Sequence, residues 1–277
     1  MNHLCTQGDF SVLMSVYKKD DPLYLLSALK SIFNDQCLKP RDIVIVGDGP
    51  LPQSIIKIID EFKKNVGGNV VNFVPLNSNV GLAAALNEGI IHCRYELIAR
   101  MDSDDIALSE RFSKQYYFML SNHDIDVCGG HILEIDAVSE KILSERKVPL
   151  VYNNVLKYAK SRSPMNHPTV MFKKSVIIKL GGYPNFRKSQ DYALWSLLLV
   201  SGYKLANCDD FFLKMRTGKE LLARRGIEHF KNEIKVLGYQ RKIKFLTLRE
   251  YFFSIFIRAV FRLSPIFIRK LLYKMTR

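Results

Sequence analysis

The stretch "FSVLMSVY" (residues 10–17) is a short apolar run that stops at a group of charged residues before Pro22. A continuous apolar run of this length predicts a strand that is buried on both faces of a sheet. The next segment, residues 23–33, places its apolar side chains at helical spacing. Together they predict a strand followed by a helix, which is the first half of a βαβ unit.

The same pattern returns three times along the chain. The further predicted strands are "DIVIVGDGP" (residues 42–50), "NVVNFVPL" (residues 69–76) and "LIARM" (residues 97–101), and Asn79 is in position to cap an Ala-rich helix. Buried strands that alternate with helices of about a dozen residues indicate a doubly wound α/β fold with a mainly parallel sheet. We expect this fold over roughly the first 210 residues.

Composition and charge limit the class of protein. A chain of 277 residues with 48% hydrophobic side chains can bury a large core. The five cysteines stand singly, without the spacing of a zinc site or a disulfide framework, which fits a reduced, cytosolic compartment. The first ten residues lack a basic segment followed by an apolar one, so we expect no signal peptide there.

The net charge of +14 lies almost entirely in the C-terminal part of the chain. Residues 214–277 carry 17 Lys and Arg against 4 Asp and Glu, whereas residues 1–213 carry 24 against 23. We therefore predict a nearly neutral domain over residues 1–213 and a basic helical region over residues 214–277.

Ligands of open α/β sheets bind beyond the carboxyl ends of the strands, which here selects Tyr17, Asp48 and the acidic stretch "DSDD" (residues 102–105). One interpretation of the acidic stretch is a solvated turn that caps a helix. The other is a site for Mg²⁺ or Mn²⁺, which accept carboxylates together with substrate phosphates. Arg100 either faces this site or extends to solvent from the surface.

Six motifs occur in an order and spacing that resemble one family. They are "FSVLMSVY", "VIVGDG", "NVGLAAALNEGI", "ARMDSDD", "GGY" and "QDYALW". Over about residues 10–215 the chain resembles the family 2 inverting glycosyltransferases with the GT-A fold, and among them the bacterial enzymes of O-antigen and exopolysaccharide synthesis. The sequence departs from the family at "GDGP", where "DDGS" is common, and at "ALNEG", where "ARNxG" is common.

The resemblance implies roles for the strand-end residues. Asp102 and Asp104 match the D-x-D motif that holds Mn²⁺ or Mg²⁺ and the diphosphate of the donor. Asp48 matches the acidic residue at the uracil or ribose, and Tyr17 lies where the family places a residue beside the base. Arg100 is a further candidate for donor binding.

The acceptor side is predicted from a later segment. Asp191 begins an apolar helical run, and the resemblance implies that it is the base that takes the proton of the acceptor hydroxyl; the alternative is a helix N-terminal residue favoured by the macrodipole. His167, in the predicted strand "NHPTVMF" (residues 166–172), could contact the acceptor or be structural. Trp195 could stack on an acceptor sugar or pack in the core.

The C-terminal region combines basic and bulky apolar residues. Its longest uncharged run is seven residues, "YFFSIFI" (residues 251–257), which is too short to span a bilayer. Phe252, Phe253 and Phe256 lie near Arg258 and Arg262, and Arg269, Lys270 and Lys274 follow a break at Pro265. This composition is typical of a basic amphipathic helix on an anionic membrane. A helical lid on the catalytic domain and nucleic-acid binding are the alternatives, and we expect no nucleic acid as partner.

The resemblance therefore predicts a peripheral enzyme at the cytoplasmic face of the bacterial inner membrane. It would move glucose or galactose from a UDP-sugar to GlcNAc-diphosphate-undecaprenol, with a β-1,3 linkage, in O-antigen repeat-unit synthesis. A sugar nucleotidylyltransferase is a rival, but it normally has a glycine-rich loop after the first strand, and "SVYKKDDP" has no glycine. A non-enzymatic basic protein that binds membranes or nucleic acids would leave the strand-end carboxylates unexplained.

Overall fold

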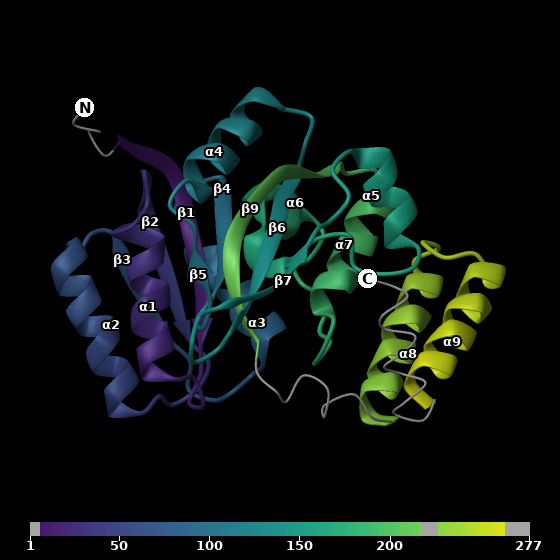
Figure 1. Ribbon diagram of the computed structural model, residues 1–277, viewed down its shortest axis with the longest axis horizontal. Coiled ribbons are helices and arrows are strands. Elements are labelled where there is room, and N and C mark those ends of the chain that lie inside the picture. The colour runs from purple at the N-terminus through teal and green to yellow at the C-terminus, as the bar shows by residue number, and fades with distance from the viewer. Residues whose placement is uncertain (1–5, 218–226, 264–277) are drawn as a thin grey trace.

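The computed structural model describes residues 6–217 and 227–263 (Figure 1). The predicted residues Arg269, Lys270 and Lys274 lie outside this part of the chain. Within it, one sheet contains β1 (Thr6–Val16), β2 (Leu38–Gly47), β3 (Val71–Pro75), β4 (Leu97–Asp102), β5 (Ile106–Ala107), β6 (Val127–Asp136), β7 (Ile142–Arg146), β8 (Met171–Lys173) and β9 (Leu205–Thr217). The helices are α1 (Pro22–Phe33), α2 (Gln53–Val66), α3 (Leu82–His92), α4 (Arg111–Ser121), α5 (Tyr152–Ala159), α6 (Lys174–Lys179), α7 (Gln190–Val200), α8 (Ile227–Lys242) and α9 (Leu248–Leu263).

The first half of the sheet is parallel, as predicted. In the strand order β3-β2-β1-β4-β8-β6-β9-β5, all pairings among β1, β2, β3 and β4 are parallel, and β6 also pairs in parallel with β9. Because parallel partners run in the same direction, β1, β2 and β4 present their carboxyl ends at one edge. The α/β prediction with a mainly parallel sheet is confirmed.

The second half of the sheet contains the antiparallel pairings. Strand β8 pairs antiparallel with both β4 and β6, β7 pairs with β6, and β5 pairs with β9. The prediction of a strand over residues 166–172 is wrong for its first part, where His167–Thr169 form a 3-10 turn before β8. Pro168 has no N–H to donate to a strand partner. The Thr169 N–H donates to the Asn166 carbonyl and closes the turn at 2.9 Å.

Alternate side chains of β1 enter the cores on the two faces of the sheet. Phe10, Val12 and Met14 pack in one buried cluster with residues of α1, α2 and α4. Leu13 packs in the other with residues of α3 and α7. This alternation explains the nearly continuous apolar run in the sequence, since both faces of the strand are covered.

Helices α8 and α9 lie side by side at the end of the sheet that carries α7 (Figure 1). Gln240 of α8 is fully buried and donates from Nε2 to the Ser196 hydroxyl of α7 at 2.7 Å. The Lys160 ammonium, just after α5, donates to the Phe245 carbonyl between the two helices. The C-terminal helices are therefore packed on the α/β body, and β9 runs past residue 213 to Thr217. Among the described residues, no helix is both long and apolar enough to cross a membrane.

Candidate active site

Carboxylates gather at the carboxyl edge of the parallel strands. Oxygen atoms of Asp102, Asp104 and Asp105, one from each, all lie within 4.8 Å of one another. Asp102 is the last residue of β4, the loop after it holds Asp104 at the surface, and Asp105 is buried at 2% exposure. The backbone N–H of Arg216 in β9 donates to the Asp105 carboxylate at 3.1 Å, so Asp105 ties this loop to the sheet.

The loop is electrostatically strained by its own charges. Partial desolvation in the loop, together with the neighbouring charges of Asp102 and Asp20, raises the pKa of Asp104 to about 6, although the residue itself remains exposed. Burial and the charges of Asp102 and Asp104 raise the pKa of Asp105 as well. A divalent cation would relieve this repulsion, and oxygen ligands at this separation suit a hard cation. The donor set therefore fits Mn²⁺ or Mg²⁺, with Asp102 and Asp104 as the accessible ligands.

Arg100 lies beneath this loop, and the alternative of a surface arginine is wrong. Its side chain is 2% exposed, and its two terminal nitrogens donate to the two carboxylate oxygens of Asp102, one of them at 2.7 Å. Such a paired contact fixes the plane of the carboxylate. Burial raises the pKa of Asp191, and the positive charge of Arg100 partly counteracts this rise.

A fourth carboxylate, Asp20, joins the site although the motifs did not indicate it. The Ser103 hydroxyl donates to Asp20 at 2.7 Å, and the Tyr17 N–H donates to the same oxygen at 3.1 Å. Burial raises the pKa of Asp20. Asp20 thus links the end of β1 to the acidic loop across 83 residues of sequence. The Tyr17 side chain is 40% exposed beside it and remains accessible to a ligand.

Asp48 organises the loop that leads into α3. Its carboxylate accepts from Asn79 Nδ2 at 2.9 Å, from the Val80 N–H at 2.7 Å and from the Gly81 N–H at 3.1 Å. Asn79 therefore binds Asp48 and does not cap the helix, whose N-cap is Gly81. Gly49 has φ +87, and a Cβ there would lie 2.7 Å from the backbone nitrogen of Asn79. This close approach of the two loops requires glycine.

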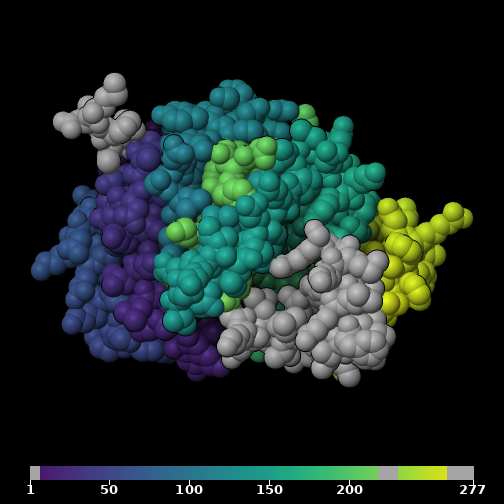
Figure 2. Space-filling model, in the orientation of Figure 1, coloured from purple at the N-terminus to yellow at the C-terminus, as the bar shows by residue number. Residues whose placement is uncertain are grey.

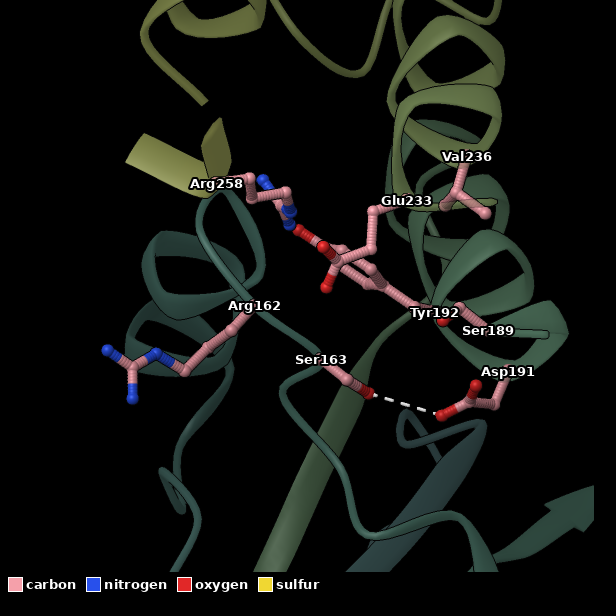
Figure 3. Close-up of a pocket in the computed structure, with 8 residues that line it drawn as sticks. All are labelled: Arg162, Ser163, Ser189, Asp191, Tyr192, Glu233, Val236 and Arg258. Atoms are coloured by element: carbon pink, nitrogen blue, oxygen red, sulfur yellow. Dashed lines mark hydrogen bonds between the residues drawn. The ribbon is translucent and has the colours of Figure 1, made fainter. Parts of the chain in front are cut away.

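Asp191 is the second residue of α7, as the sequence predicted, and it faces a pocket. The Ser163 hydroxyl lies 3.4 Å from its carboxylate (Figure 3). Burial raises the pKa of Asp191, which brings the carboxylate closer to the proton affinity that a general base needs. Its backbone is preceded by Ser189 in the left-handed conformation, with φ 59, and this turn sets the start of the helix at the pocket.

His167 and Trp195 lie side by side under the site. Trp195 is fully buried and His167 is 9% exposed, with ring centroids 6.0 Å apart. His167 Nε2 also lies 2.9 Å from the Tyr183 hydroxyl, and burial and the Arg100 charge lower the pKa of this histidine. In this packing neither ring presents a face to an acceptor, so their predicted acceptor contacts would require the packing to open.

The backbone of Tyr183 is held by two hydrogen bonds to one side chain. Asn87 of α3 accepts from the Tyr183 N–H at 2.7 Å and donates to the Tyr183 carbonyl at 3.0 Å. Gly182 has φ +83, and a Cβ there would lie 2.4 Å from the Asn87 side chain. The "GGY" and "ALNEG" motifs therefore meet in space, and this contact fixes the segment that precedes α7.

The pocket at Asp191 has a volume of about 190 Å³. It lies between the start of α7 and the C-terminal helices (Figure 3). The side chains that line it are Arg162, Ser163, Ser189, Asp191, Tyr192, Glu233, Val236 and Arg258. Sequence motifs indicated Asp191 alone among them, because α8 and α9 bring in Glu233 and Arg258 through tertiary packing.

Comparison with known proteins gives a consistent result. A family model described as glycosyl transferase family 2 matches residues 11–181. A protein of Escherichia coli named UDP-Gal:alpha-D-GlcNAc-diphosphoundecaprenol beta-1,3-galactosyltransferase is 36% identical over 266 residues, which cover 96% of this chain and 95% of that protein. The amylovoran biosynthesis glycosyltransferase AmsE of Erwinia amylovora is 34% identical over 272 residues, or 97% of this chain and 99% of that one.

A solved structure shows the same architecture at low sequence identity. The mannosyltransferase PcManGT of Pyrobaculum calidifontis, in complex with GDP-Man and Mn²⁺, superimposes with a TM-score of 0.61 at 16% identity, covering 91% of this chain and 69% of that chain. This likeness supports the shared fold. The chain therefore belongs to glycosyl transferase family 2 and has the GT-A fold.

Proposed function

We propose that this protein moves a hexose, glucose or galactose, from a UDP-sugar to GlcNAc-diphosphate-undecaprenol in O-antigen repeat-unit synthesis, with inversion and a β-1,3 linkage. The donor and acceptor classes follow the name of the Escherichia coli relative, which aligns along almost the whole of both chains. One observation carries the reaction class: carboxylate oxygens of Asp102, Asp104 and Asp105 lie within 4.8 Å of one another where β4 ends, as a divalent cation that binds a diphosphate leaving group requires.

The chain's own residues would share the work of the displacement. Asp191 would accept the proton of the acceptor hydroxyl as that oxygen attacks the anomeric carbon and the bond to the diphosphate breaks. Attack from the face opposite the leaving group turns an α-linked donor into a β-linked product. Arg100 would hold Asp102 in the orientation that it needs. Mn²⁺ or Mg²⁺ bound by Asp102 and Asp104 would neutralise charge on the leaving diphosphate.

The donor nucleotide would lie against the ends of β1 and β2. Tyr17 is exposed there, and Asp48 shapes the neighbouring loop of residues 79–81. A carboxylate can accept about four hydrogen bonds, of which residues 79–81 use three, so Asp48 can still accept one from the base or ribose.

An activity screen tests the proposal. Purified protein with Mn²⁺ would be incubated with UDP-galactose, UDP-glucose and UDP-GlcNAc and a synthetic GlcNAc-diphosphate-lipid, and the product linkage read by NMR. We expect a β-1,3-linked hexose from UDP-galactose or UDP-glucose. If no sugar were transferred from any of the three donors, or if the product were α-linked, the proposed reaction would be rejected.

We further propose that the C-terminal region, 214–277, attaches the protein peripherally to the anionic cytoplasmic face of the membrane, while residues 1–213 form the catalytic domain. Helix α9 supports this, because Phe252, Phe253 and Phe256 are 60–66% exposed on it. It stands at the edge of the molecule, in yellow, in Figure 2. Exposed basic side chains lie near the start of α9 at Arg241, Lys242, Lys244 and Arg249. Exposed aromatic bulk beside basic residues favours an anionic interface.

Vesicle binding by the full chain tests this attachment. Changing the three phenylalanines to serine should abolish co-sedimentation with vesicles that contain phosphatidylglycerol. The control changes two exposed apolar residues at the β6–β7 pairing, Val138 (89% exposed) and Leu143 (59%), to serine, and should bind as the wild type does. Equal binding by both variants would show that α9 is not the membrane contact.

A further inference from the structure

Two arginines line the same pocket as Asp191, on the side of α5 and α9. Arg258 of α9 points toward Tyr192 and Glu233 in the interior of the pocket, whereas Arg162 extends outward on the same side (Figure 3). Arg258 donates to the Ser161 carbonyl at 3.1 Å. This contact holds α9 against the chain segment that follows α5.

The lining of the pocket combines two kinds of polar group. Carboxylates and hydroxyls from Asp191, Glu233, Ser163 and Ser189 are partners for the hydroxyl groups of a sugar. Guanidinium groups match the geometry and charge of phosphate, and Arg258 and Arg162 bring two of them to the lining of this one pocket. The volume of the pocket, about 190 Å³, is below the roughly 300–1,000 Å³ of sites for drug-sized ligands. The pocket therefore suits one sugar and not a lipid chain.

We propose that Arg258 and Arg162 bind the diphosphate of the lipid-linked acceptor, while its first sugar occupies the pocket with the attacking hydroxyl at Asp191. This inference rests on the proposed function, because it assigns the phosphate of that acceptor to named residues. A sugar phosphate carries the attacking hydroxyl and the phosphate on one ring. The residues that bind the hydroxyl and the phosphate must therefore line one small cavity, and Asp191 and the two arginines do so. The lipid would leave on the side of α9, the helix that bears the exposed phenylalanines.

A pair of acceptors separates phosphate binding from other roles. One is GlcNAc-α-diphosphate joined to a long alkyl chain, and the other is the uncharged GlcNAc-α-alkyl glycoside with the same chain. The variants are Arg258→Gln and Arg162→Ala, and the control is Lys157→Ala, which removes an exposed positive charge five residues before Arg162. The measured quantities are kcat/KM for each acceptor, KM for the UDP-sugar, and Tm as a check on folding.

We expect each arginine variant to lose roughly tenfold in kcat/KM for the diphosphate acceptor, the effect of one lost charge-assisted contact. Its kcat/KM for the uncharged glycoside and its KM for the UDP-sugar should match the wild type, and Lys157→Ala should leave all three unchanged. Equal losses with both acceptors would overturn the inference while leaving the proposed function intact. If the wild type transferred sugar to neither acceptor, the inference and the proposed function would both be rejected.

Discussion

Replacing Asp48 with alanine tests how the donor side of the site is held together. The Asp48 side chain is the shared acceptor for three donors from the loop that leads into α3, two of them backbone N–H groups. It is 5% exposed, so the carboxylate relies on these donors and not on water. We expect the variant to lose stability and donor affinity together.

The magnitude follows from the contacts. Hydrogen bonds to a charged acceptor contribute roughly 1.5–3 kcal/mol each. Val80 is 47% exposed, so its freed N–H can be hydrated, and loss of the other two contacts should make Asp48→Ala cost about 3–6 kcal/mol. For a chain of this size that lowers Tm by roughly 6–18 °C. Asn79→Ala removes one donor while the carboxylate keeps two backbone partners, and should cost only about 1.5–3 kcal/mol.

Thermal and urea unfolding of both variants measure these costs, and calorimetry with UDP measures the donor affinity. We expect Asp48→Ala to be the less stable of the two and to bind UDP more weakly than the wild type. If Asp48→Ala were no less stable than Asn79→Ala, the carboxylate would not be holding residues 79–81. If its UDP affinity equalled that of the wild type, the loop would not belong to the donor site.

Three further predictions concern charge in the site. Burial raises the pKa of Asp191, and a base must be ionised to act, so at saturating Mn²⁺ kcat/KM should fall as pH drops through a pKa above the ordinary value of about 3.9; a limb at or below that value would contradict the assignment. Arg100→Lys keeps the charge but loses the paired contact with Asp102, and we expect weaker Mn²⁺ binding by calorimetry with Tm changed by only a few degrees; unchanged Mn²⁺ affinity would argue against this orienting role. Chelation with EDTA should abolish transfer, Mn²⁺ should restore it in the wild type, and Asp104→Asn should blunt the recovery; full activity in EDTA would exclude the metal.

Local sequence patterns were sufficient for the parallel half of the sheet and for the acidic loop. The apolar runs at residues 10–17, 42–50 and 97–101 coincide with β1, β2 and β4 because each strand is covered on both faces. The spacing of Asp102 and Asp104 is local, so it could be recognised without knowledge of the fold. The position of Asp191 at the start of α7 was also predictable from the apolar run that follows it.

Contacts between distant segments were beyond these patterns. Asn79 looked like a helix cap, since its sequence neighbours do not reveal that Asp48 accepts from it. Asp20 joins the acidic loop through a hydrogen bond from Ser103, which is 83 residues away in the sequence. Arg162 comes from the segment that follows α5, and Arg258 comes from α9. Helix α9 packs on α8, and α8 packs on α7, which brings Arg258 to the pocket. Nothing in the local sequence around Arg258 encodes that position.

The turnover of Asp191→Asn with UDP-galactose or UDP-glucose, whichever the wild type uses, and the diphosphate-linked acceptor tests the central claim most directly. The change keeps the size of the side chain and removes its ability to take a proton. A general base contributes on the order of 10²–10⁴-fold to the rate, so we expect kcat to fall by that factor while UDP-sugar affinity and Tm stay near those of the wild type. A correctly folded Asp191→Asn protein that kept most of its turnover would show that the acceptor proton goes elsewhere.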